Sequence, residues 1–158
     1  MTNREQHFIQ AAIDLARQGM RNNQGGPFGC LVVKGNDVIG KGCNCVSSYN
    51  DPTAHAEVVA IRDACRNLQN FRLTGCEIYT SCEPCPMCLG AIYWARPDRV
   101  YYAGSRFDAS NAGFDDSAIY EELVLPFKER KIQMLQLEQG KAIELFKEWL
   151  EKEDRVDY

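Results

Sequence analysis

Two short motifs that can bind a metal constrain how this chain folds, because a shared metal site requires them to meet. The first is His-Ala-Glu at residues 55–57, and the second is Pro-Cys-Pro-Met-Cys at residues 84–88. One imidazole and two thiolates form a donor set that suits zinc, which prefers tetrahedral coordination in proteins. Three protein ligands leave the remaining position to water, as catalytic zinc sites do. The sequence therefore predicts that His55, Cys85 and Cys88 converge on one zinc ion.

Both motifs are expected at the beginning of a helix. Pro86 suits the first helical position, and the exposed backbone N–H groups there favour the negative charge of the two thiolates. The histidine lies near the start of the segment 54–68, which has apolar residues at helical spacing after an Asp-Pro-Thr sequence at residues 51–53. Glu57 follows the histidine by two residues, so it can reach a water at the metal without serving as a ligand.

This arrangement predicts hydrolytic chemistry with Glu57 as the catalytic acid and base. Zinc lowers the pKa of a bound water to about 7 from about 16 in bulk, which gives hydroxide at neutral pH. Glu57 would take the proton from that water as hydroxide attacks the substrate, and would later protonate the departing group. A zinc-stabilised binding module without turnover is the alternative from another class. A closed structural site would need a fourth ligand, for which Cys82, Glu83 and other single cysteines are available.

Composition and charge restrict the protein class further. The 158 residues are 45% hydrophobic and 25% charged, which fits one domain over residues 1–158. No apolar stretch approaches the roughly 20 residues that cross a bilayer, and a signal-peptide core is absent from the first residues, so no membrane partner is expected. The eight cysteines are expected as reduced thiols in a cytoplasmic protein, with Cys43 and Cys45 as small buried side chains. The net charge of −4 argues against nucleic acid and for a small substrate.

The pattern of apolar residues and turn signals predicts an α/β protein with three α/β/α layers around a mixed central sheet. Helices are expected at residues 3–21, 54–68, 86–95 and 141–151. Strands are expected at residues 28–34, 38–46, 77–80, 99–103 and 131–137, with a turn at 35–37 and an irregular loop at 105–116. Strands that alternate with helices in the middle of the chain indicate parallel pairing there, added to an initial hairpin.

The motifs also carry a family resemblance. Residues 50–57 and 80–96 contain the H-x-E and P-C-x-x-C pattern of zinc-dependent nucleobase deaminases. With residues 25–29 and 112–117 added, nearly the whole chain resembles the cytidine-deaminase-like superfamily and, within it, the bacterial guanine deaminases. The resemblance implies a cytidine-deaminase-like fold, one Zn²⁺ per subunit, and conversion of guanine and water to xanthine and ammonia in purine catabolism or salvage.

Several residues are candidates for contacts with a purine. Asn44 offers both a donor and an acceptor, and Phe28 and Trp94 could stack on the base for on the order of 1 to 3 kcal/mol. In the family the matching asparagine contacts the base, and an aspartate that matches Asp116 meets the amino edge. From the residues alone, Asn44 is better explained as a turn residue at the end of a strand, and Asp116 as a solvated carboxylate or helix cap. Core packing explains Phe28 nearly as well as stacking on a base.

The resemblance also implies how the C-terminus is used. In bacterial guanine deaminases the C-terminal segment closes the active site and often comes from the partner in a domain-swapped homodimer. Residues 139–158 and the terminal Tyr158 match that arrangement. Guanosine, cytosine and pterin deaminases would share the whole metal apparatus and differ only in the pocket walls. A tRNA adenosine deaminase would share both motifs too, but we expect a basic surface for it.

Overall fold

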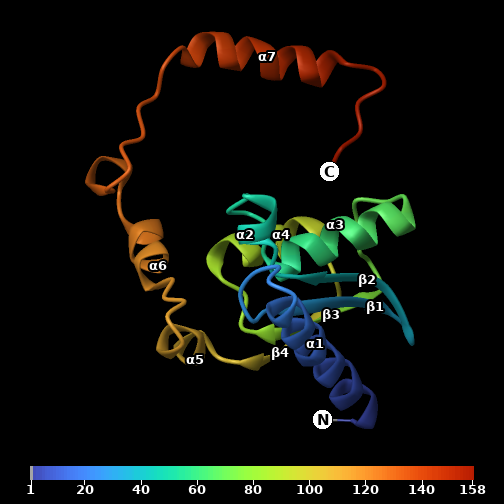
Figure 1. Ribbon diagram of the computed structural model, residues 1–158. Helices are drawn as coiled ribbons and strands as arrows, with labels where there is room; N and C mark the ends of the chain where they lie inside the picture. The colour runs from blue at the N-terminus through green and yellow to red at the C-terminus, as the bar shows by residue number, and fades with distance from the viewer. Residues whose placement is uncertain (1) are drawn as a thin grey trace. The chain divides into compact units, whose positions relative to one another are not determined.

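The computed structural model describes residues 2–158, which divide into two compact units, the first ending at Asp116 and the second spanning Ser117–Tyr158. The elements of the first unit (Figure 1) are α1 (Asn3–Arg21), β1 (Gly29–Lys34), β2 (Asp37–Cys43), α2 (Val46–Tyr49), α3 (Ala56–Leu68), β3 (Cys76–Cys82), α4 (Pro86–Ala95), β4 (Arg99–Gly104) and α5 (Arg106–Asn111). The second unit contains α6 (Ser117–Val124), the 3₁₀ turn η1 (Phe127–Glu129) and α7 (Gln139–Glu151).

Four strands form one mixed sheet in the order β2-β1-β3-β4. Strand β1 is antiparallel to both β2 and β3, whereas β3 and β4 are parallel. Helix α1 covers one face of the sheet, and α3 and α4 lie together on the other (Figure 1). The predicted α/β class with three layers and a mixed sheet is therefore confirmed.

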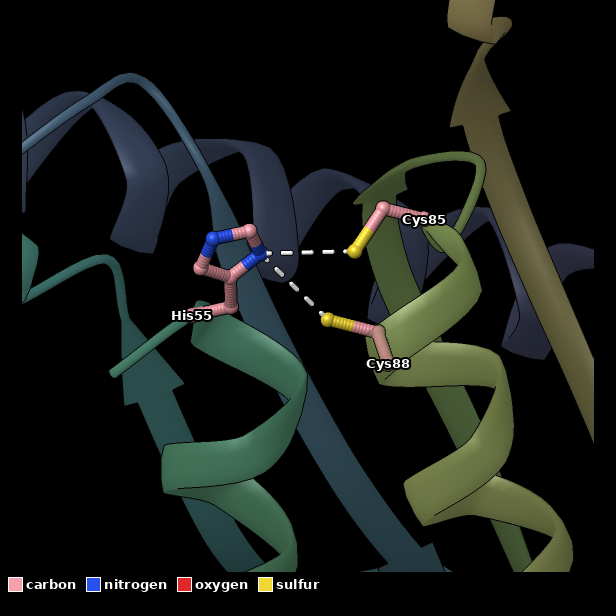
Figure 2. Close-up of side chains that lie close together, drawn as sticks. All are labelled: His55, Cys85 and Cys88. Carbon is pink, nitrogen blue, oxygen red and sulfur yellow. Dashed lines mark hydrogen bonds between the residues drawn. The ribbon is translucent and has the colours of Figure 1, made fainter. Parts of the chain in front are cut away.

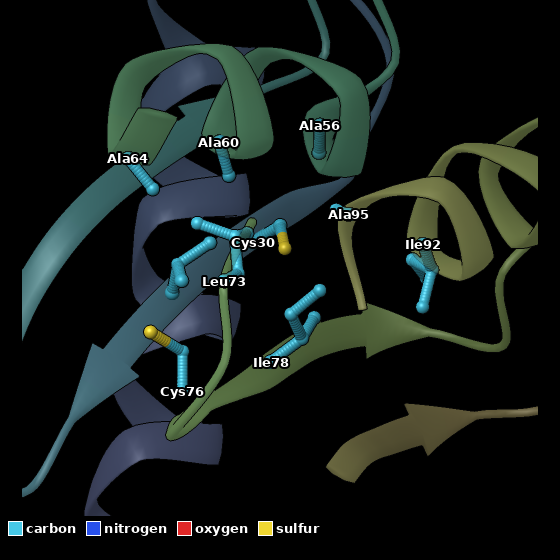
Figure 3. Packing of buried hydrophobic residues seen from close by; sticks show 10 residues of the cluster. Cys30, Ala56, Ala60, Ala64, Leu73, Cys76, Ile78, Ile92 and Ala95 are labelled. Carbon is cyan, nitrogen blue, oxygen red and sulfur yellow. The ribbon is translucent and has the colours of Figure 1, made fainter. Parts of the chain in front are cut away.

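Each face of the sheet has its own apolar core, because side chains alternate along a strand. On one face Leu31, Val33 and Tyr79 pack against Phe8 and Ala12 of α1. On the other face (Figure 3) the cluster consists of Cys30, Val32, Ala56, Ala60, Ala64, Leu73, Cys76, Ile78, Ile92 and Ala95. The small alanines of α3 allow this helix to lie close to the strands, which fixes the position of its first turn.

Gly42 of β2 shows how close that approach is. A Cβ atom at this position would lie 2.4 Å from the backbone oxygen of Ala56 and 2.6 Å from the backbone nitrogen of Ala60. Such distances are shorter than van der Waals contact, so a larger residue would push α3 away from the sheet. The glycine thus sets where α3 begins, directly after His55.

The structure departs from the sequence-based expectations at two places in the first unit. The loop expected at residues 105–116 contains the helix α5, which begins with a capping box formed by Ser105 and Asp108. The strand expected at 38–46 ends at Cys43, and Val46 instead begins α2. Cys43 and Cys45 are both buried, with their sulfur atoms 3.9 Å apart, and all eight cysteines are free thiols.

The second unit lacks the strand expected at residues 131–137, so that prediction is wrong. Its alternating apolar residues have no neighbouring strand to pair with, and a strand without a ladder leaves its backbone groups unsatisfied. Within Ser117–Tyr158 no residue is buried, and Ile132, Leu135 and Leu137 are each 79–82% exposed. Within residues 2–158 no helix is both long and apolar enough to traverse a lipid bilayer.

Candidate metal centre and active site

The metal-ligand motifs meet on the face of the sheet that carries α3 and α4. His55 is the N-cap residue of α3, Cys85 is the N-cap residue of α4, and Cys88 lies in the first turn of α4. Neither His55 nor Cys85 uses its side chain to cap its helix. Figure 2 shows the imidazole directed at both sulfur atoms, with Nδ1 3.6 Å from Sγ of Cys85 and 3.5 Å from Sγ of Cys88.

These separations suit zinc. Bonds of about 2.0 Å to nitrogen and about 2.3 Å to sulfur in tetrahedral geometry place the donor atoms about 3.6 Å apart. The donor atoms of the three residues lie within 4.8 Å of one another, and within residues 2–158 this is the one such cluster found. The donor set and its spacing therefore fit a zinc ion with three protein ligands.

The loop before Cys85 is held by the segment that follows β4. The backbone nitrogen of Glu83 donates to the oxygen of Gly104 at 2.8 Å, and a carboxylate oxygen of Glu83 accepts from the backbone nitrogen of Arg106 at 3.0 Å. The thiol of Cys82 donates to the backbone oxygen of Ser105 at 3.6 Å. Cys82 and Glu83, the nearest candidates for a fourth protein ligand, thus bind the backbone at the start of α5 and are not part of the cluster.

The ionisable groups of the cluster affect one another strongly. A hydrogen bond from Cys88 lowers the pKa of Cys85, with a further contribution from His55. The hydrogen bond to Cys85 in turn raises the pKa of His55, and the pKa of Cys88 rises because it donates to Cys85 and is buried. Negative charge at Cys85 is therefore favoured before a metal binds, and zinc would displace the remaining protons.

Glu57 lies in the first turn of α3 and is only 5% exposed. Its Oε1 atom accepts a hydrogen bond from the hydroxyl of Thr80 at 2.7 Å. Burial raises the pKa of Glu57, and the Thr80 hydrogen bond opposes that shift. The carboxylate lies near enough to the cluster that its charge contributes to the raised pKa of both His55 and Cys88. Glu57 is thus a buried carboxylate beside the metal ligands.

Asn44 is buried and joins the loop before β1 to the start of α2. Its Oδ1 atom accepts from the backbone nitrogens of Gly26 at 3.1 Å and Val46 at 3.3 Å, and its own backbone nitrogen donates to the oxygen of Phe28 at 3.0 Å. The sequence suggested that this amide offers a donor and an acceptor to a ligand. Since the backbone occupies Oδ1, the Nδ2 group is the part of the side chain left for recognition.

Two of the other predicted contact residues lie in the same region. The ring of Phe28 meets the ring of Phe114 edge to face, with centroids 4.9 Å apart. Asp116 lies close enough for its charge to help raise the pKa of His55, and burial raises its own pKa. Phe114 and Thr80 were not predicted as site residues. The capping box that starts α5 would have indicated an ordered segment leading to Phe114, whereas Thr80 gave no signal because it reads as an ordinary strand residue.

Trp94 and Tyr158, the remaining predicted contact residues, are both exposed side chains. Trp94 lies six residues after Cys88 on α4 and is 64% exposed, a displacement of about 9 Å along the helix axis. Tyr158 belongs to the second unit and is 71% exposed. Their contact with a substrate therefore stays a prediction.

The fold and the three-residue cluster define a zinc-binding deaminase, and comparison with known proteins agrees. Residues 2–104 match the family described as the cytidine and deoxycytidylate deaminase zinc-binding region, and the chain belongs to this family. The chain is 49% identical over 151 residues to guanine deaminase of Bacillus subtilis, covering 96% of this chain and 97% of that protein. It is 32% identical over 148 residues to tRNA-specific adenosine deaminase of Aquifex aeolicus, covering 94% and 95%.

The similarity extends to three-dimensional structure. The X-ray structure of guanine deaminase from Bacillus subtilis superimposes with a TM-score of 0.95 at 47% identity, covering 100% of this chain and 99% of that one. The resemblance that the motifs indicated is therefore confirmed over the full length of the chain.

Proposed function

We propose that this protein is a guanine deaminase that converts guanine and water to xanthine and ammonia. The observation that carries the proposal is the buried carboxylate of Glu57 beside the convergent side chains of His55, Cys85 and Cys88. The guanine deaminase of Bacillus subtilis is more similar to the chain than the adenosine deaminase of Aquifex aeolicus, at 49% against 32% identity. This difference favours guanine over an adenosine in tRNA.

The residues of the site have two functions in the proposed reaction, metal binding and proton transfer. When bound by His55, Cys85 and Cys88, zinc supplies a water activated for attack on the carbon that bears the amino group. The carboxylate of Glu57 takes a proton from the attacking water and gives it to the adjacent ring nitrogen. The second proton of the water leaves with the amino group as ammonia, so that an oxygen replaces the exocyclic nitrogen.

The polar groups near the cluster suit the edges of guanine. Asn44 has only its Nδ2 donor to offer, because its Oδ1 atom is engaged by Gly26 and Val46. A donor pairs with the acceptors O6, N7 or N3 of guanine. It distinguishes guanine from adenine only at O6, because adenine has an amino group there and shares N3 and N7. Asp116 supplies an acceptor for N1–H or the amino group, and Phe28 provides an aromatic wall.

The second unit supports a homodimer, which we include in the proposal. Apolar side chains on α6, α7 and the segment between them are exposed in the single chain: Ile119, Leu123, Val124, Phe127, Ile132, Leu135, Leu137, Leu145, Phe146, Leu150 and Tyr158. This amount of exposed apolar surface is typical of an interaction site. A second copy of the chain would cover it, with residues 139–158 and Tyr158 closing a deaminase site by domain swapping. Residues 1–158 would then act as one deaminase domain per subunit.

A reducing compartment suits the eight free thiols, and we place the enzyme in the cytoplasm.

The test of the activity is ammonia release from a panel of substrates. Guanine, guanosine, adenine, cytosine and a tRNA anticodon stem would each be supplied to the zinc-loaded protein. We expect guanine to be preferred by a wide margin in kcat/KM. Preferred release from cytosine or from the tRNA stem would overturn the choice of substrate and leave the hydrolytic site in place.

The Glu57→Gln variant tests whether the site catalyses a reaction at all. It should retain zinc, measured by metal analysis, and lose turnover, because the amide cannot accept the proton. A zinc-stabilised binding module would instead be unaffected by this change, and full ammonia release by the variant would refute the assigned role of Glu57.

A further inference from the structure

Thr80 lies outside both metal-ligand motifs, but in the structure its side chain contacts Glu57. It lies on β3, a central strand of the sheet, and its backbone pairs with Cys30 of β1 on one side and Tyr102 of β4 on the other. The side chain is fully buried. Its hydroxyl donates to Oε1 of Glu57 at 2.7 Å, which joins the sheet directly to the first turn of α3.

Packing alone does not account for a threonine at this position. On the same face of β3 its neighbours Ile78 and Cys82 are buried apolar side chains. A hydroxyl in such surroundings costs free energy unless it forms a hydrogen bond, and valine would fill the same space without that cost. Within residues 2–158 the buried polar or charged side chains are Asn44, Glu57 and Thr80, so two of the three form this one contact.

The geometry of the contact suits a positioning function. A glutamate side chain has several rotatable bonds, whereas a β-branched threonine on a doubly paired strand has few accessible rotamers. Thr80 engages Oε1, and the side chain of Cys88 also forms a hydrogen bond with the Glu57 carboxylate. The Thr80 donor comes from the sheet rather than from α3, so Oε1 is held by an element that does not carry the metal ligands.

We propose that Thr80 is a positioning residue for the reaction, holding the Glu57 carboxylate in the orientation in which it moves the proton. This inference rests on the proposed deaminase function and adds to it the residue that orients the proton carrier. Thr80 does not touch the substrate or the metal ligands in this account. Its removal should therefore affect the rate of the chemical step and spare both substrate binding and zinc content.

The kinetic test uses three substitutions at one position and a matched control. Thr80→Val removes the hydroxyl and keeps the shape, Thr80→Ser keeps the hydroxyl, and Thr80→Ala serves if the valine variant fails to fold. Thr74→Val is the control, since Thr74 is exposed on the turn before β3. At metal sites, loss of a residue that does not bind the metal but hydrogen-bonds a group around it typically lowers activity about 10- to 100-fold.

We expect Thr80→Val to lower kcat for guanine about 10- to 100-fold, with KM within about threefold of wild type because binding is unchanged. Thr80→Ser should recover most of the rate, and Thr74→Val should match the wild type. Unchanged kcat in Thr80→Val, or a serine variant as slow as the valine variant, would overturn the proposal. So would a rise in KM at constant kcat, because that result indicates a contact with the substrate.

A second measurement does not depend on turnover. Crystal structures of the zinc-loaded wild type and Thr80→Val should differ in the side-chain torsions of Glu57, with the carboxylate rotated or disordered in the variant. An unchanged Glu57 side chain would refute the positioning function even if the rate fell. If the wild type released no ammonia from any base, the proposed function would fail, and the two crystal structures would still decide whether Thr80 orients Glu57.

Discussion

The Oδ1 atom of Asn44 lies 3.1 Å from the backbone nitrogen of Gly26 and accepts its hydrogen. This contact joins the end of β2 to the loop before β1. The adjacent Gly25 leaves no room for a side chain, since a Cβ atom there would lie 2.3 Å from the same Oδ1 atom. The hydrogen bonds of Oδ1 to the backbone and the proposed contact of Nδ2 with a ligand therefore involve different atoms of one side chain.

Asn44→Asp should separate these functions experimentally. The carboxylate keeps an oxygen for Gly26 and Val46 but replaces the Nδ2 donor by an acceptor, so we expect KM for guanine to rise at least about tenfold, as expected when a polar group at a binding site loses its partner. Asn44→Ala removes both functions and should also reduce the free energy of unfolding by about 1 to 3 kcal/mol. Steady-state kinetics and denaturant unfolding would measure the two effects. An aspartate variant with unchanged KM would show that Nδ2 does not contact the base.

Removal of the metal should expose one cysteine selectively. The pKa of Cys85 is lowered by its hydrogen bond from Cys88, whereas burial and Cys45 raise the pKa of Cys43 to about 11. A thiolate reacts with alkylating reagents and a thiol does not. Chelator-treated protein should therefore be alkylated first at Cys85 at neutral pH, as mapped by mass spectrometry, and added zinc should protect it. Equal labelling of Cys43 and Cys85 would contradict the electrostatic interpretation.

A pair of glycine substitutions tests how the position of α3 supports the site. Gly42→Ala places a methyl group 2.4 Å from the backbone oxygen of Ala56, so we expect a loss of about 1 to 3 kcal/mol in stability from overpacking and weaker zinc binding. Gly90→Ala on α4 meets nothing within 4 Å and should stabilise the protein by about 0.5 to 1 kcal/mol through helix propensity. Thermal unfolding and zinc titration would measure both. The test fails if the two variants respond alike.

The capping box of α5 predicts a defined pH dependence. Hydrogen bonds from the side chain and backbone of Ser105 lower the pKa of Asp108 below its ordinary value of 3.8. A carboxyl group whose pKa is lower in the folded state stabilises that state fully above pH 3.8, and the stabilisation is lost as the pH falls through the folded-state pKa. Wild type should therefore exceed Asp108→Asn in unfolding free energy near neutral pH, with the difference shrinking in acid. A difference that grows in acid would reverse the sign and refute the argument.

The assembly can be tested with truncated chains. Full-length protein should scatter light as a dimer, and a chain ending at Glu138 should be monomeric because it lacks α7. Removal of residues 153–158 should leave the zinc content unchanged. It should reduce turnover of guanine about tenfold or more, because the site would lose a segment proposed to exclude water from it. A monomeric full-length protein would remove the domain-swapped dimer from the proposal, and an unimpaired short truncation would remove Tyr158 from the site.

Local signals explain which parts of this fold were predictable. Helix α1 has apolar residues at helical spacing, and α4 has Pro86 at its start, so both were predicted with the bounds that the structure has. The short helix α5 was missed because six residues are too few to show a helical period. The strand expected at 131–137 was wrong because alternation alone does not supply a partner strand.

Local sequence signals also explain which residues of the candidate site could be predicted. His55, Glu57, Cys85 and Cys88 could be predicted because their spacing in the sequence is dictated by helix starts and metal chemistry. The contact between Thr80 and Glu57 could not, since it joins residues 23 positions apart through the packing of α3 against the sheet. Tertiary packing of this kind leaves no periodic pattern in the sequence.

The metal-ligand residues belong to the starts of two helices, whereas Asn44 and Asp116, two of the side chains proposed to contact the base, lie in connecting loops after β2 and α5. Substitutions in those loops can therefore change which nucleobase is bound while the metal ligands and Glu57 stay the same. Relatives that act on free guanine and on adenosine in tRNA would then differ in the sequences of these loops and share the same hydrolytic mechanism.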